Sequence, residues 1–224
     1  IPALGHKFEN GVCTVCGWRE AGLYAGDELL MTWDDLVANG YVVADGEGGR
    51  RLKYVADSLY GTLVIAEGVE QVGDSDPLCP DGESKLECVY LPSTVTTIRS
   101  DAFNGCAALE EVRFFGPVES IGGGAFRDCT ALEVFEIPEG LENIPDYMLC
   151  GCTSLKSIVI PSWVKTVGMC AFDGCSALEK VELCEGIEEI SGFAFGGTAI
   201  HELVYPSTVT AVGDMCGPYS EALP

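Results

Sequence analysis

The stretch AFRDCTALEVFEIPEGLENIPDY, from Ala125 to Tyr147, is the clearest copy of a unit of about 23 residues that this chain repeats. Further copies follow the same pattern and begin at Ala102, Met148, Ala171 and Ala194. Weaker copies extend the repetition upstream to Leu63, so that seven units are visible. A period of this length predicts a solenoid, in which each unit buries its apolar side only against its neighbours.

Two repeated positions identify the side of the unit that faces the interior. The second position is almost always aromatic and holds Phe103, Phe126, Leu149, Phe172 and Phe195. The fifth position holds Cys106, Cys129, Cys152 and Cys175. Because cysteine serves here as a small apolar residue in one shared position, we expect buried thiols. Neighbouring coils would nevertheless bring these residues near disulfide distance, so pairing is not forbidden by geometry.

Each unit also contains a short alternation of apolar and polar residues, as from Leu132 to Pro138. Alternation with a period of two predicts a strand. A proline ends this strand in four units, at Pro92, Pro138, Pro161 and Pro206. The Ala-Phe-x-x-Cys segment at the start of a unit predicts a tight helical or 3₁₀ turn. We therefore expect an α/β solenoid, a right-handed leucine-rich-repeat array with short parallel strands stacked about 4.8 Å apart.

Residues 1–52 precede the regular repeats and are expected to form an N-terminal cap. Thr32 is followed by an acidic first turn, which predicts a short helix that ends at Gly40. Residues 41–44 and 52–55 alternate as strands across a glycine-rich turn. These elements would cover the open first coil, while residues 53–224 would form the solenoid with an irregular C-terminal repeat as its other end.

The N-terminal segment GHKFENGVCTVCGW contains the one motif that resembles a metal site. His6, Cys13 and Cys16 could offer three ligands to zinc, since a Cys-x-x-Cys knuckle presents both sulfurs to one ion. A structural zinc site needs four ligands, and no second pair of ligands follows nearby. A local disulfide, free thiols and a vestigial knuckle are the alternatives, and no other cofactor is indicated.

The charge of the chain limits its partners. With 12 basic against 35 acidic residues, the formal net charge is −23. Nucleic acid is therefore excluded as a partner, and anionic membrane surfaces are disfavoured, because their phosphates would be repelled. Simple solubility explains such a charge, and so does a cationic partner. The sequence contains no run of about 18 apolar residues, so no membrane insertion is expected.

The repeated units AFxGCxxLxxVxIPxGVxxIG resemble the BspA-like class of leucine-rich repeats over roughly Leu63 to Gly213. The flanking motifs HxFxNGxCxxCG and TWDDLVANGY also look like segments that accompany such repeats in bacterial surface proteins. The resemblance implies a protein secreted by, or displayed on the surface of, a host-associated bacterium. It further implies adhesion, that is, binding to host matrix proteins or glycans. It assigns no binding residue, because the family has no shared ligand motif.

A ligand surface can be sketched from the strand residues that face away from the core. The candidates in one column are Tyr90, Arg113, Glu136, Val159 and Glu182, and the column ends at Val204. A neighbouring column contains Glu111, Val134, Ser157, Lys180 and Glu202. Trp163 is added because other units have small residues, threonine or proline at its position. Solenoids usually offer this side to partners, although a solvated sheet would show the same mixture, and Trp163 could simply pack on a neighbouring loop.

Catalysis is not expected from this sequence. Glu136 and Glu182 lie two coils apart, hence about 10 Å, which approaches the carboxylate spacing of an inverting glycosidase. A short open sheet, however, supplies no pocket that would tune their pKa values. His201 lies far along the chain from any nucleophile. We therefore expect a non-catalytic extracellular interaction module that binds a protein or a glycan, or alternatively a structural spacer within a larger surface protein.

Overall fold

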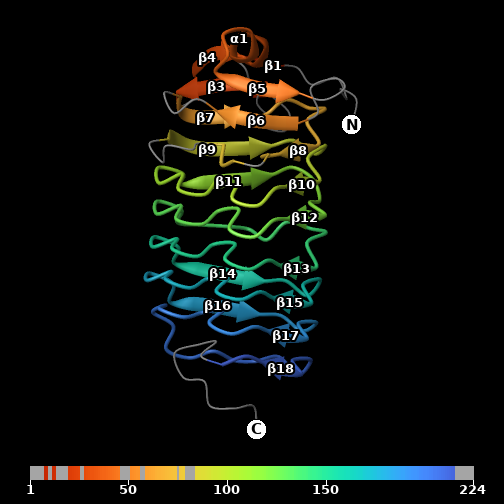
Figure 1. The fold of residues 1–224 in the computed structure, drawn as a ribbon, viewed down its shortest axis with the longest axis vertical. Coiled ribbons are helices and arrows are strands. Elements are labelled where there is room, and N and C mark those ends of the chain that lie inside the picture. Colours follow the sequence, from red (N-terminus) through yellow and green to blue (C-terminus); the bar gives the residue numbers. More distant parts are fainter. Residues whose placement is uncertain are drawn as a thin grey trace.

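A computed structural model describes residues 8–9, 12–13, 20–25, 28–45, 51–55, 59–74, 76–78 and 84–214 of the chain. Over these ranges the chain winds into a β-solenoid of about seven turns (Figure 1). The N-terminal strands lie at one end and β18 (Ala211–Val212) lies at the other. The predicted solenoid of parallel strands is confirmed.

Two stacks of short strands run along the solenoid, and we call them the first and the second sheet. In spatial order the first sheet contains β11 (Glu111–Phe114), β9 (Lys85–Leu91), β7 (Tyr60–Val64), β3 (Gly22–Ala25) and β4 (Glu28–Thr32), and after an interruption β14 (Ser157–Ile160) and β16 (Lys180–Leu183). The second sheet contains β12 (Ser120–Ile121), β10 (Thr97–Ile98), β8 (Gln71–Val72), β6 (Arg51–Val55) and β5 (Val42–Asp45), and after an interruption β13 (Asn143–Ile144), β15 (Thr166–Val167), β17 (Glu189–Ile190) and β18. Strands of successive repeats pair in parallel, with Ser157 opposite Lys180.

The third side of each coil, the turn side, is formed by the Ala-Phe-x-x-Cys segments. These segments are successive tight turns, as where the Cys106 N–H donates to the Phe103 carbonyl at 3.2 Å. A residue with positive φ, such as Gly105 at 76°, follows within each turn and prevents a helix from propagating. Within the described ranges α1 (Trp33–Ala38) is the only α-helix. The α/β class expected from the sequence is therefore not confirmed, and the fold is a β-solenoid.

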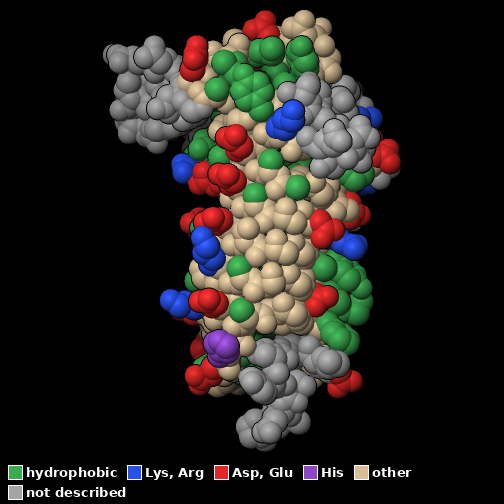
Figure 2. All heavy atoms as spheres, turned by 90° about the vertical axis from the view of Figure 1, so that its left-hand side faces the viewer, with side chains coloured by type: hydrophobic (Ala, Val, Ile, Leu, Met, Phe, Trp, Pro, Cys, Tyr) green, Lys and Arg blue, Asp and Glu red, His purple; other side chains and the backbone are tan. Residues whose placement is uncertain are grey.

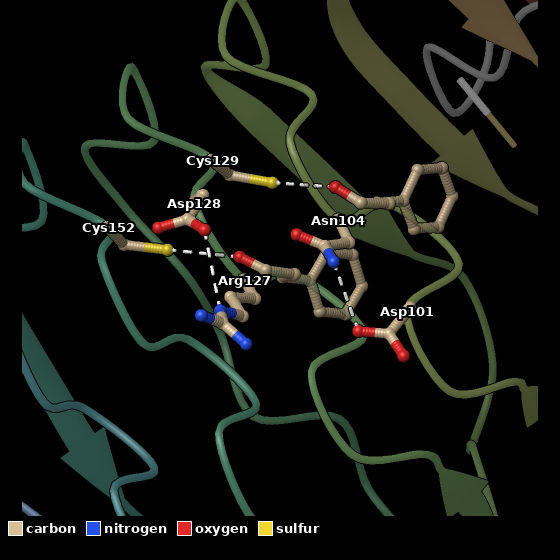
Figure 3. A network of polar contacts seen from close by, with 8 residues as sticks. Asp101, Asn104, Arg127, Asp128, Cys129 and Cys152 are labelled. Carbon is tan, nitrogen blue, oxygen red and sulfur yellow. Dashed lines mark hydrogen bonds and ion pairs between the residues drawn. The ribbon is translucent and has the colours of Figure 1, made fainter. Parts of the chain in front are cut away.

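The cysteines of the fifth position form a ladder of thiol hydrogen bonds inside the turn side (Figure 3). Three of these thiols donate to the carbonyl of the second position one coil earlier: Cys129 to Phe103 at 3.1 Å, Cys152 to Phe126 at 3.2 Å, and Cys175 to Leu149 at 3.1 Å. All of these cysteines are free thiols, as the shared position predicted. The ladder therefore joins consecutive coils through the core without disulfides.

Aromatic rings of the second position stack along the core beside this ladder. Phe103 and Phe126 lie with ring centroids 5.2 Å apart and planes 6° from parallel. Phe172 and Phe195 repeat the arrangement at 5.2 Å and 4°. The side chains of Phe126, Phe172 and Phe195 have no exposed surface. The periodic pattern of the sequence is thus converted directly into columns of like residues in contact.

The N-terminal elements add to the first coils. Thr32 caps α1 through a capping box with Asp35, as the sequence predicted. β5 and β6 pair in antiparallel fashion, and β3 joins the first sheet antiparallel to β7. Leu36 of α1 is fully buried in the common core. The boundary expected after residue 52 falls inside β6, and the interpretation of residues 1–52 as a cap remains a prediction.

The proposed zinc ligands lie largely outside the described residues. β1 (Phe8–Glu9) and β2 (Val12–Cys13) form a two-stranded antiparallel pair. For Cys13 only the backbone is described, as part of β2. His6 and Cys16 are not described. The zinc interpretation of this motif therefore stays a prediction from the sequence.

Both sheets are interrupted at the coil that begins at Ala125. In the first sheet the segment 134–137 pairs with neither β11 nor β14, and in the second sheet β12 and β13 are not paired. Between residues 84 and 214 this is the one place where the strands of two consecutive coils are unpaired on both sides. The turn side is continuous across the same junction, since the Phe103 N–H donates to the Ala125 carbonyl at 2.7 Å.

Two features of the sequence explain the interruption. In the second sheet, the N–H groups of Gly122 and Gly168 each donate to a carbonyl of the preceding coil, at 2.8 and 2.9 Å. In the coil that begins at Ala125, the equivalent residue is Pro145, which has no N–H to donate. In the first sheet, Phe114 and Phe135 occupy inward positions that hold smaller aliphatic residues in most other coils. Their rings meet edge to face at 5.7 Å. We infer that this extra volume between adjacent coils keeps the strands from pairing.

Hydrogen exchange should report the interruption directly. Glu136 lies in the unpaired segment 134–137, whereas Arg113 and Glu182, at the same position of their coils, lie in paired strands. We expect the amide of Glu136 to exchange faster than those of Arg113 and Glu182 by on the order of 100-fold, because its exchange needs no opening of a strand ladder. Amide exchange followed by NMR measures this, and equal protection at all three residues would show that the sheet is continuous.

Candidate interaction surface on the first sheet

The outward side of the first sheet carries the columns of residues expected from the sequence. Arg113, Glu136, Val159 and Glu182 are exposed, while the inward residues between them, such as Ile158, are buried. Tyr90 is half-buried on the same side. The predicted orientation of these strands is therefore confirmed.

The interruption of the first sheet is accompanied by a hollow of about 490 Å³ on this surface. We call it the Trp163 hollow, and it is lined by Phe114, Phe115, Gly116, Pro117, Glu136, Ile137, Pro138, Glu139 and Trp163. The indole N–H of Trp163 donates to the Pro138 carbonyl at 3.2 Å, which holds the ring in place. Trp163 still exposes 38% of its surface. Its out-of-pattern position in the sequence is thus explained by a place in the wall of a cavity.

A second hollow of about 260 Å³ adjoins the first, because both are lined by Phe114, Phe115 and Glu136. Arg113 lines it and is held by Glu111 at 2.6 Å, and the guanidinium lies 5.1 Å from the centre of the Tyr90 ring. The hydrogen bond to Glu111 raises the pKa of Arg113. The charge of Arg113 is therefore already matched within the protein.

The remaining predicted residues lie farther along the same surface. Glu182 lines a third hollow of about 490 Å³ with Glu185, Glu202 and Val204. Val159 is 49% exposed on β14 and lines none of these three hollows. Of the six predicted residues, the structure thus brings Tyr90 against Arg113 and Glu136 beside Trp163. It does not bring Glu136 and Glu182 into one hollow, so the pair of carboxylates considered from the sequence does not form one site.

Sequence reasoning missed Phe115, which lines both adjoining hollows. Phe115 is 40% exposed and stands at the position that is proline in four other coils, including Pro138 and Pro161. Its ring meets Tyr90 edge to face at 6.0 Å. The signal was present in the alignment of the repeats, since an aromatic in a proline position breaks the pattern as clearly as Trp163 does.

Negative charge dominates the Trp163 hollow. Glu136 and Glu139 line it, and none of its lining residues is Lys or Arg. No ion pair joins either carboxylate to another described residue. Among the described residues, no group of three or more His, Cys, Asp or Glu side chains could hold a metal ion. In the same ranges no helix has the length and apolar character to cross a membrane.

A second exposed apolar surface lies on the turn side, where Figure 2 shows hydrophobic side chains gathered along the right of the lower half. Tyr147, Met169 and Phe193 belong to it and are 36%, 41% and 43% exposed. The Tyr147 N–H donates to the Met169 carbonyl at 2.9 Å, so these residues follow one another on adjacent coils. This surface shares no residue with the Trp163 hollow.

A β-solenoid with regular short strands, a turn-side ladder and an open, hollowed sheet defines a leucine-rich-repeat module. The model of the BspA type leucine rich repeat region matches residues 96–223 in six copies. The chain therefore belongs to the BspA-type leucine-rich-repeat family, as its repeats suggested. None of the curated proteins compared with the chain matches it.

Two solved structures illustrate the similarity. A leucine rich cell surface protein from Faecalibacterium prausnitzii is 25% identical with a TM-score of 0.67, and the alignment covers 77% of this chain and 48% of that one. A leucine-rich repeat protein from Eubacterium ventriosum is 24% identical with a TM-score of 0.70, covering 83% and 53%. This chain therefore spans about half the length of these two structures. At 24% identity, the similarity to the Eubacterium ventriosum protein supports a shared fold and nothing further.

Proposed function

We propose that this chain is a non-catalytic interaction module that binds an extracellular protein or glycan through the outward side of the first sheet. The observation that carries the proposal is the Trp163 hollow. Three exposed apolar residues, Phe115, Pro117 and Trp163, meet there in the wall of one cavity. Concave sites with apolar walls and a few convergent polar groups are the usual form of binding sites.

Location at the cell surface is part of the same proposal. The family consists of leucine-rich repeats, which generally serve protein interactions, and one similar structure is described as a cell surface protein. The acidic character of the chain suits an exposed, soluble module. Adhesion to host molecules would use Tyr90, Arg113, Glu136, Val159, Trp163 and Glu182 as the contact residues.

Arrays of extracellular matrix proteins and glycans test this function. We expect saturable binding to at least one of them, and a loss of about tenfold or more in affinity when Trp163→Ala removes the anchor at the centre of the surface. Arg113→Ala should weaken the same interaction by disturbing Tyr90 and Glu111. Binding constants from biolayer interferometry, with circular dichroism to confirm folding, provide the measurement.

Phe193→Ala is the matched control. Phe193 is similarly exposed but belongs to the turn-side surface, so its removal should leave the affinity unchanged. A structural spacer, the alternative function, predicts no saturable binding to any member of the arrays. An equal loss with Trp163→Ala and Phe193→Ala would assign the interaction to neither surface and would contradict the proposal.

A further inference from the structure

We propose that the Trp163 hollow receives an arginine side chain from a basic, extended segment of a partner protein. This inference rests on the proposed function, because it names the occupant of the same surface. The inference goes beyond the proposed function because it assigns a chemical class to the ligand and a role to Glu139, Phe115 and Pro138. The steps that lead to it are the charge of the hollow, the fixed indole and the shape of the cavity.

Charge is the first step. Glu136 and Glu139 face one cavity that has no basic residue in its wall, and neither forms an ion pair with a described residue. The nearest arginine along the surface, Arg113, is already held by Glu111 at 2.6 Å. The carboxylates of the hollow therefore lack a cation that the protein itself could supply. A cationic group from outside would complement them, and the net charge of −23 would steer it toward this surface.

The fixed indole is the second step. The hydrogen bond from Trp163 to the Pro138 carbonyl limits rotation of the ring, so little side-chain entropy is lost when a ligand contacts it. Tryptophan is the aromatic residue that binds cations most strongly through its ring. A guanidinium can stack on an indole and also bind a carboxylate through two N–H groups, which an ammonium cannot do. Arginine is therefore favoured over lysine.

The protein already contains the same interaction on this surface. The guanidinium of Arg113 lies 5.1 Å from the Tyr90 ring centre while Glu111 accepts its hydrogen bond at 2.6 Å. Trp163 with Glu136 and Glu139 repeats this combination of aromatic ring and carboxylate, without the arginine. The neighbouring coil thus shows the arrangement that an incoming arginine would complete.

Shape is the third step. A volume of about 490 Å³ lies within the range of roughly 300–1,000 Å³ that is usual for ligand sites. The hollow continues into the second one through Phe115 and Glu136. An extended segment could therefore place one side chain beside Trp163 and its next residues along β11. A neutral glycan could also stack on Trp163, but it would leave both carboxylates without a charge partner, so the charge favours the basic segment.

Calorimetric titration of the whole chain tests the inference with a short blocked glycine–serine peptide that carries two arginines. The matched peptide has citrulline in place of each arginine, which keeps the shape and removes the charge. We expect saturable binding of the arginine peptide that weakens with added salt, and weaker binding by at least about tenfold for the citrulline peptide. A lysine peptide should bind with intermediate affinity.

Variants of the chain locate the binding. Trp163→Ala and the double variant Glu136→Gln with Glu139→Gln should each lower the affinity by about tenfold, whereas Trp163→Phe should retain most of it. The control is the double variant Glu188→Gln with Glu189→Gln, which removes the same charge from the second sheet and should change the affinity by less than about twofold. Circular dichroism confirms that each variant is folded.

Several outcomes would overturn the inference. The first is a citrulline peptide that binds as tightly as the arginine peptide. The second is a loss of affinity in the Glu188 and Glu189 control as large as that in the Glu136 and Glu139 variant. The third is no saturable binding of the arginine peptide up to about 5 mM. A neutral oligosaccharide that binds in a Trp163-dependent way, while the arginine peptide does not, would replace the basic segment by a glycan. The proposed function is judged separately, by whether binding to a protein or glycan on the arrays depends on Trp163 and not on Phe193.

Discussion

Phe126→Ala is expected to lower the free energy of unfolding by about 3–5 kcal/mol, the usual cost of removing a fully buried phenylalanine. Phe126 has no exposed surface, stacks on Phe103 at 5.2 Å, and meets Phe135 edge to face at 5.0 Å. The cavity would open at the coil whose sheets are already interrupted. Urea unfolding followed by circular dichroism measures the change.

Phe172 supplies a matched comparison for this experiment. It occupies the same position of its coil and is equally buried, but among the described residues its one ring contact is with Phe195. Phe172→Ala should therefore cost less than Phe126→Ala by about 0.5–1.5 kcal/mol, the worth of an aromatic pair. Phe126→Leu should be better tolerated, since Leu149 fills this position naturally. A loss below about 1 kcal/mol for Phe126→Ala would contradict the packing described here.

Raising the pH above 9 is expected to destabilise the fold through the thiol ladder. Burial raises the pKa of Cys175 from the ordinary 9.0 to about 12 and raises that of Cys152 well above its ordinary value. Below pH 9 both states keep their protons, and the stability is unaffected. Between pH 9 and 12 the unfolded chain loses the thiol proton while the folded chain keeps it, so unfolding becomes more favourable. For Cys175 alone the difference amounts to about 4 kcal/mol.

Comparison with Cys175→Ser isolates this effect from the ionisation of other groups. Serine can donate a similar hydrogen bond to the Leu149 carbonyl, but it does not titrate in this range. Urea unfolding under reducing conditions at several pH values between 8 and 12 should show a smaller loss of stability for Cys175→Ser than for the wild type. Identical curves for the two proteins would indicate that Cys175 ionises normally and is not buried as described.

Periodicity was sufficient to predict most of the scaffold. The strands of most units, the inward direction of Phe126 and the free-thiol state of Cys129 follow from a repeated position having one environment. The strand expected from Leu132 to Pro138 does not form, because that segment pairs with neither neighbouring coil. The helix at Trp33–Ala38 was predictable because its start depends on local capping by Thr32. The α/β class is not confirmed for the repeats, because residues with positive φ, such as Gly151 and Gly174, limit each segment to turns.

The candidate site was predictable only in part. Trp163 could be singled out by its exception to the pattern, and Phe115 is an exception of the same kind. The hollow between them could not be inferred, because it accompanies an interruption of strand pairing at Val134–Ile137 that no single repeat announces. We attribute that interruption to the contact between Phe114 and Phe135, and the separate interruption of the second sheet to Pro145. Such cooperation between neighbouring coils is invisible when each unit is read as a copy of one consensus.

The uneven connection at this coil has a mechanical consequence. Along the turn side, the Phe103 and Gly105 amides donate to the carbonyls of Ala125 and Arg127 at 2.7 and 2.8 Å, while the two sheets are unpaired. Between the two sheets, the Val118 N–H also donates to the Glu139 carbonyl at 2.8 Å. A stack joined along the turn side and at this corner, but unpaired along both sheets, is expected to bend more easily at this level than at its fully paired coils. Bending there would alter the spacing of the walls of the Trp163 hollow, so the curvature of the rod and the fit of the proposed ligand would depend on the same coil.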